Sequence, residues 1–115
     1  MLDVIDSIHR LQWTVDHHYA HIEAQHDFMR AWAVQFELAY TDFRVIQMAL
    51  QLSGEKQHPL LKQFAAQYEE IYKYEYVFAG KGLDAFNDQF GRDLSAYKEA
   101  VGAFDETIQA IIALQ

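Results

Sequence analysis

The chain of 115 residues contains no cysteine, a single proline and five glycines. Without cysteine it has no disulfide framework, no thiolate nucleophile and no zinc or iron–sulfur site built on sulfur ligands. Pro59 and the first glycine, Gly54, both come late, so residues 1–53 contain no helix breaker. The first half of the chain is therefore free to form long helices.

Targeting and membrane signals are also missing. The opening residues 1–6, MLDVID, lack the positive charge and the apolar block of a signal peptide. No segment approaches the run of about 20 apolar residues that crosses a bilayer. Together with the absence of cysteine, these features favour a cytoplasmic protein with no membrane partner.

Positive charge is scarce. Nine Lys and Arg face 17 Asp and Glu, which gives a formal net charge of -8, and the basic residues are scattered along the chain. Such a charge repels phosphate backbones and anionic lipid. We therefore expect a protein partner rather than a nucleic acid or a membrane surface.

Apolar and aromatic residues are plentiful, at 51% and 15% of the chain. This composition excludes a disordered tail and supplies more large side chains than a two-stranded coil can hide. A chain of this length buries somewhat under ~70% of its unfolded surface when it folds. We expect one helical-bundle domain over residues 1–115.

An apolar residue recurs every seven positions through the first half of the chain: Ile8, Val15, Ile22, Met29, Phe36, Phe43 and Leu50. A seven-residue apolar period predicts helices that pack along a buried seam. Residues 28–52 are apolar nearly all round, because further residues lie on the far side: Val34, Leu38, Val45, Met48 and Leu52. A helix of this kind is expected to be enclosed by several neighbours.

The predicted fold is all-α, an antiparallel four-helix bundle with helices near 3–25, 28–52, 59–79 and 84–113. Gly54 and Pro59 mark a turn over 53–59, and Gly80 and Gly82 end the third helix. Asp27 and Asp84 are candidate helix caps. The alternative is one N-terminal helix of about 50 residues with two shorter helices packed along it in a dimer, because the seven-residue phase continues through 24–28.

One dense group of residues can bind a metal: His17, His18, His21, Glu23 and His26. His17 and His21 are one helical turn apart, and Glu23 and His26 have the Glu-x-x-His spacing found in di-iron bundles. No cofactor is expected other than a divalent transition metal held here by imidazoles. The alternative is a polar layer around His18 that fixes the register of the seam.

Large apolar side chains on the second and third helices indicate an interface. We expect a homodimer that buries one of two groups: Trp32, Phe36 and Phe43, or the tyrosine-rich end with Tyr72, Tyr74 and Tyr76. Tyrosine and tryptophan suit protein interfaces and pockets for planar ligands, although ordinary core packing also uses them.

Motifs of catalysis are absent from the sequence: it has no nucleophile elbow, phosphate-binding loop or dinucleotide fingerprint. We therefore expect a non-enzymatic interaction or regulatory protein that acts through helix–helix and acidic-surface contacts. The alternative is a bundle that binds a metal or small ligand through the histidine cluster or the tyrosine-rich end.

Overall fold

The computed structural model describes residues 1–53 and 59–115, and within these ranges it is helical, with no strand. The described residues form five helices: α1 (Ile5–Glu23), α2 (Trp32–Gln51), α3 (Pro59–Lys81), α4 (Leu83–Phe90) and α5 (Ser95–Ile112). The all-α prediction is confirmed. Aromatic residues alternate along Tyr72–Phe78, a spacing that strands also show, and this segment is helical and lies inside α3.

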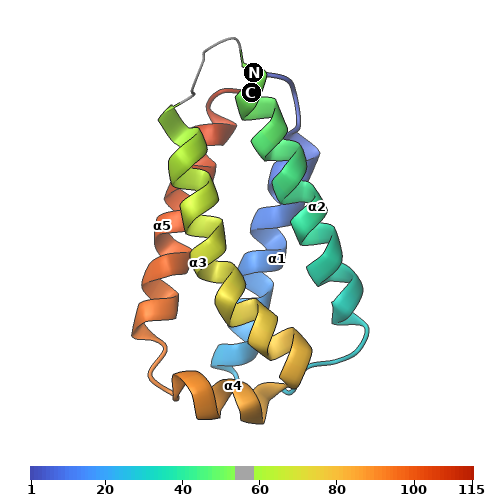
Figure 1. The fold of residues 1–115 in the computed structure, drawn as a ribbon, viewed down its shortest axis with the longest axis vertical. Coiled ribbons are helices and arrows are strands. Elements are labelled where there is room, and N and C mark those ends of the chain that lie inside the picture. The colour runs from blue at the N-terminus through green and yellow to red at the C-terminus, as the bar shows by residue number, and fades with distance from the viewer. Residues whose placement is uncertain (54–58) are drawn as a thin grey trace.

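The four long helices lie side by side along the long axis, and α4 crosses one end (Figure 1). Each long helix packs on two others: α1 on α2 and α5, and α3 on α2 and α5, while α4 packs on α3. Both chain ends lie at the end opposite α4 (Figure 1), where the Val4 amide donates to Oε1 of Gln115 at 2.7 Å. The overall extents are 45 × 27 × 18 Å.

The alternative of one long N-terminal helix is wrong, because α1 ends at Glu23 and α2 begins at Trp32. Gln25 takes a left-handed backbone conformation with φ of 57°, and such a residue stops a right-handed helix. Met29 lies in this connection and is 57% exposed. The seven-residue apolar period therefore passes through a loop by coincidence, and the predicted break is confirmed.

The predicted last helix, 84–113, is in fact two helices, α4 and α5, separated at Gly91. Gly82 and Gly91 have φ of 89° and 75°, a region that glycine enters without steric penalty. The predicted turn over 53–59 lies mostly outside the described residues. On its two sides α2 ends at Gln51, and α3 begins with proline, as expected for a first helical position.

Asp27 does not cap the helix that follows it in the chain. Its Oδ1 accepts hydrogen bonds from the amides of Phe28 at 2.9 Å and Leu83 at 3.1 Å. Leu83 is the first residue of α4, so Asp27 joins the α1–α2 connection to the start of a helix distant in sequence.

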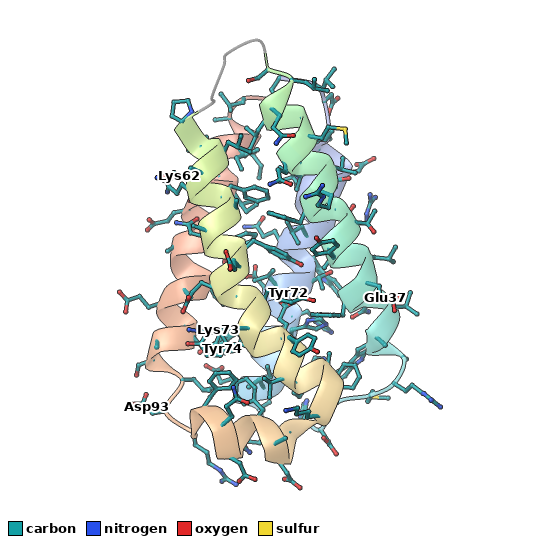
Figure 2. The ribbon with its side chains drawn as sticks, viewed as in Figure 1. Glu37, Lys62, Tyr72, Lys73, Tyr74 and Asp93 are labelled. Atoms are coloured by element: carbon teal, nitrogen blue, oxygen red, sulfur yellow. The ribbon has the colours of Figure 1, made fainter. Side chains whose placement is uncertain are left out.

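The core runs the length of the molecule and is largely aromatic. Phe43 of α2 stacks on Tyr68 of α3 at 4.3 Å between ring centroids and also contacts Phe64. Phe86 of α4 is fully buried and closes one end. Figure 2 shows side chains filling the space between the helices, with Tyr72 near the middle and Lys62 at the outside. Truncating such a core residue to alanine costs about 2–5 kcal/mol.

No helix among the described residues is both long enough and apolar enough to cross a membrane.

Candidate functional site

A polar pair occupies the centre of the bundle. Nδ1 of His18 lies 3.6 Å from Oε1 of Glu75, and the two side chains are 1% and 0% exposed. Among the described residues, neither imidazole nitrogen and neither carboxylate oxygen has a hydrogen-bond partner. Burying such groups is unfavourable unless they are paired. His18 is thus a buried polar residue in the seam, and its partner is Glu75 of α3.

Two tyrosines extend this polar centre. The hydroxyls of Tyr68 and Tyr97 are buried and have no hydrogen-bond partner among the described residues. Burial, and secondly the nearby charge of Glu75, raise the pKa of both phenols well above its ordinary value. The Tyr97 ring stacks on Tyr74 with 4.3 Å between centroids. Both phenols therefore remain protonated and available as donors.

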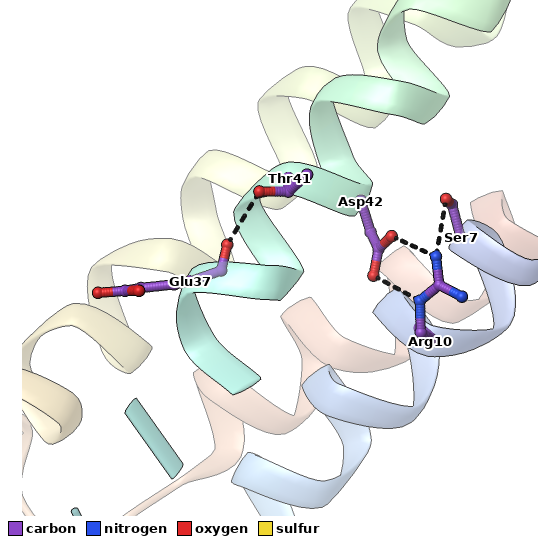
Figure 3. Close-up of polar contacts among 5 residues, drawn as sticks. All are labelled: Ser7, Arg10, Glu37, Thr41 and Asp42. Atoms are coloured by element: carbon purple, nitrogen blue, oxygen red, sulfur yellow. Dashed lines mark hydrogen bonds and ion pairs between the residues drawn. The ribbon is translucent and has the colours of Figure 1, made fainter. Parts of the chain in front are cut away.

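A second polar contact joins α1 to α2. The Arg10 guanidinium donates to both carboxylate oxygens of Asp42, at 3.0 and 3.3 Å, and also to the Ser7 hydroxyl (Figure 3). The hydrogen bond to Asp42 raises the pKa of Arg10. Because the Asp42 side chain is only 7% exposed, this two-point contact gives the buried carboxylate its partner and fixes the two helices relative to each other.

A groove of about 410 Å³ runs between α1 and α2 beside this contact. Its lining residues are His9, Arg10, Trp13, Thr14, Gln35, Leu38 and Asp42. The Trp13 and Leu38 side chains are 52% and 53% exposed, so the groove opens onto apolar surface.

The outer face of α2 carries a continuous row of exposed side chains. We call it the α2 stripe; it consists of Val34, Leu38, Thr41, Val45, Met48 and Leu52. Its apolar members are between 37% and 64% exposed. The steps along the stripe alternate between four and three residues, which is the spacing of a coiled-coil seam. The five apolar residues of the stripe were predicted to be enclosed by neighbouring helices, and within the described chain they are exposed.

Three of the predicted metal-binding residues come together at the end of α1. The Nε2 atoms of His17 and His21 lie 3.0 Å apart, and the Nδ1 atoms of His21 and His26 lie 2.9 Å apart. Trp13 stacks on His17, and Trp32 stacks on His21, with centroids 4.3 and 4.0 Å apart. Partial burial, followed by the neighbouring histidines, lowers the pKa of His21.

The other two predicted ligands lie elsewhere. His18 is buried beside Glu75, and the Glu23 carboxylate accepts a hydrogen bond from the Tyr19 hydroxyl at 2.9 Å. Within residues 1–53 and 59–115, no group of three or more His, Cys, Asp or Glu is arranged to hold a metal. The five residues predicted from the sequence to form one cluster therefore lie in three places in the fold: His17, His21 and His26 together, His18 beside Glu75, and Glu23 beside Tyr19.

The predicted interface residues differ in their solvent exposure. Phe43 and Tyr74 are buried in the core at 7% and 6% exposure, so they do not lie on a surface that a partner reaches. Trp32, Phe36 and Tyr72 are partly buried, and Phe36 contacts Tyr72 at 5.4 Å between centroids. Tyr76 is 57% exposed.

Two carboxylates meet between α1 and α5. Burial, and then a hydrogen bond to Asp105, raise the pKa of Asp16 from 3.8 to about 7. The Gln12 amide also donates to Asp105, at 3.4 Å. Asp16 therefore still holds its proton in part near neutral pH.

Sequence reasoning missed Glu75. Its signal is its position: it lies on the buried face of α3 with Tyr68, Ile71 and Phe78, at helical spacing among apolar residues. A lone acid in such a row indicates a buried partner on another helix.

Comparison of the chain with protein-family models, with curated proteins and with solved structures gives no significant match.

Proposed function

We propose that this protein is a non-enzymatic helical interaction module that works as a homodimer through the α2 stripe. The proposal includes an antiparallel four-helix bundle made of α1, α2, α3 and α5, with α4 across one end. Acidic surface outside the stripe then meets further protein partners.

The α2 stripe is the observation that carries this proposal. An isolated exposed leucine or valine is ordinary, whereas a contiguous apolar patch on a monomer marks a contact site. Val34 and Leu52 are 61% and 64% exposed at the two ends of the stripe. They are 18 residues apart, which on a helix is roughly 27 Å of continuous surface. The stripe is long enough to pair with a second helix.

The flanking charges favour a second copy of the chain as the occupant. Glu37 and Arg44 are both exposed and are separated by seven residues, so they lie on the same edge of the stripe. When two α2 helices pack antiparallel with the two-fold axis between residues 37 and 44, each Glu37 lies near Arg44 of the second copy. The two-fold symmetry of such a dimer makes the favourable pair twice.

Light scattering of the purified chain tests the proposal. We expect a mass of about twice 13.4 kDa at micromolar concentration. Leu38→Glu places a charge in the middle of the stripe and should give a monomer, because burying an unpaired carboxylate is unfavourable. Ala66→Glu adds the same charge at an exposed site on α3 and should remain dimeric. A monomeric wild-type chain contradicts the proposal.

A further inference from the structure

Two imidazoles on α1 are separated by the distance that suits one metal ion. The Nε2 atoms of His17 and His21 are 3.0 Å apart. Imidazole nitrogen binds divalent transition metals at about 2.0–2.1 Å. One ion bound to both nitrogens therefore makes an N–metal–N angle of about 90°. That angle fits the tetragonal coordination preferred by copper(II) and nickel(II) better than the tetrahedral coordination of zinc.

His26 completes the arrangement from the α1–α2 connection. When Nδ1 of His21 carries the proton, it donates to Nδ1 of His26 at 2.9 Å, which leaves the lone pair of His21 on Nε2, the atom that lies 3.0 Å from Nε2 of His17. A ligating histidine usually donates its other ring N–H in this way, and the partner fixes its tautomer and orientation. Trp13 and Trp32 further restrain the two rings by stacking on them.

We propose that His17 and His21 form a two-histidine binding site for a divalent transition metal of the copper(II) or nickel(II) class, with His26 as a positioning residue. His17 and His21 are partly exposed, so water or donor atoms of a bound molecule fill the remaining coordination positions. On binding, Nε2 of each imidazole donates a lone pair to the ion, and the ring proton of each neutral histidine resides on Nδ1.

The chain has its own reporter for this site, because its only two tryptophans are Trp13 and Trp32. The experiment titrates metal-free protein, made without a histidine tag, with copper(II) while tryptophan fluorescence is followed. We expect quenching that saturates at one equivalent of metal. Magnesium prefers oxygen ligands and should leave the fluorescence unchanged.

Substitutions distinguish copper binding at this site from copper binding to other histidines. His26→Ala removes the partner of a ligand and should weaken copper affinity by roughly 10–100-fold. His17→Ala and His21→Ala each remove a ligand and should weaken copper affinity by at least as much. His9→Ala is the matched control, because His9 is an exposed histidine two turns earlier on α1. Its affinity for copper should match that of the wild type.

Electron paramagnetic resonance of the copper complex gives a readout independent of tryptophan stacking. Two nitrogen donors are expected in the wild type and one in His17→Ala or His21→Ala, and circular dichroism verifies that each variant is folded. Equal copper affinity in wild type, His17→Ala and His21→Ala overturns the proposal, and so does a wild-type spectrum without nitrogen donors.

Discussion

Nδ1 of His18 lies 3.6 Å from Oε1 of Glu75, with both side chains out of contact with solvent. The pair joins α1 to α3. Since each of these helices packs on α2 and α5, the contact crosses the centre of the molecule. We expect a polar pair in this position to specify which residues face each other, and an apolar pair of similar volume to be equally stable or more so.

Removing one member of this pair should be far more harmful than replacing both. Glu75→Ala leaves His18 buried without its partner, and we expect it to lower the free energy of unfolding by about 3–5 kcal/mol. The double variant His18→Leu, Glu75→Leu should range from neutral to about 1–4 kcal/mol more stable than the wild type. Urea unfolding followed by circular dichroism measures both. A double variant as unstable as Glu75→Ala would show that the pair is not the source of the effect.

The carboxylate pair between α1 and α5 should make stability fall as pH rises. The pKa of Asp16 is about 7 in the folded chain and about 3.9 when unfolded. Between these values the folded state holds a proton that the unfolded state lacks, so this contribution is complete below pH 4 and is lost as pH rises through 7. Asp16→Asn should remove it.

The measurement is the free energy of unfolding at pH 5 and pH 8, with a chelator present to keep metal away from His17. From pH 5 to pH 8 the wild type should lose stability relative to Asp16→Asn. Asp105→Asn should reduce the loss, because it removes the charge that faces Asp16. Parallel pH profiles for the wild type and Asp16→Asn would contradict the assignment.

Two glycines should respond to alanine in opposite directions. Gly82 has φ of 89°, and a Cβ there would lie 3.4 Å from Oδ1 of Asp27. Gly82→Ala should therefore lower the free energy of unfolding by roughly 1–2 kcal/mol. Gly102, in the middle of α5, has no heavy atom within 4 Å of an added Cβ, and Gly102→Ala should stabilise by about 0.5–1 kcal/mol. Thermal unfolding gives both values, and a Gly82→Ala chain as stable as the wild type would rule out this turn geometry.

Exchanging the two charges beside the α2 stripe should test the direction of the paired helices. Arg44→Glu places two acids together at each end of the contact and should weaken the dimer several-fold, since one exposed pair contributes about 0.2–1 kcal/mol. Adding Glu37→Arg should restore the affinity, as measured by sedimentation equilibrium. If the double variant dimerises no better than Arg44→Glu, the two α2 helices do not cross in opposite directions.

Helices were easier to predict than their ends. The predicted helices 3–25 and 28–52 correspond to α1 (Ile5–Glu23) and α2 (Trp32–Gln51). They could be predicted because apolar spacing indicates which face of a helix is buried. The same spacing continued through Met29 in a loop, where it has no structural meaning. Gly91 was a visible warning of a break, yet sequence alone does not decide whether a glycine ends a helix or lies within it, as Gly102 does.

In the candidate sites, contacts within one helix could be predicted from the sequence, whereas contacts between helices could not. His17 and His21 come together because they are one turn apart on one helix. His18 is rotated by about 100° from His17, and its partner Glu75 comes from a different helix, which local spacing does not reveal. The α2 stripe was visible as apolar positions, but whether the chain's own helices cover that face depends on packing.

The solvent exposure of two methionines tests the central claim most directly. Met29 and Met48 are each 57% exposed in the single chain, but only Met48 belongs to the α2 stripe. The measurement is the broadening of their methyl signals by a soluble paramagnetic reagent, with the methionine methyls isotopically labelled. A homodimer through the stripe protects Met48 and leaves Met29 broadened, whereas equal broadening of both signals at micromolar and higher concentration would contradict it.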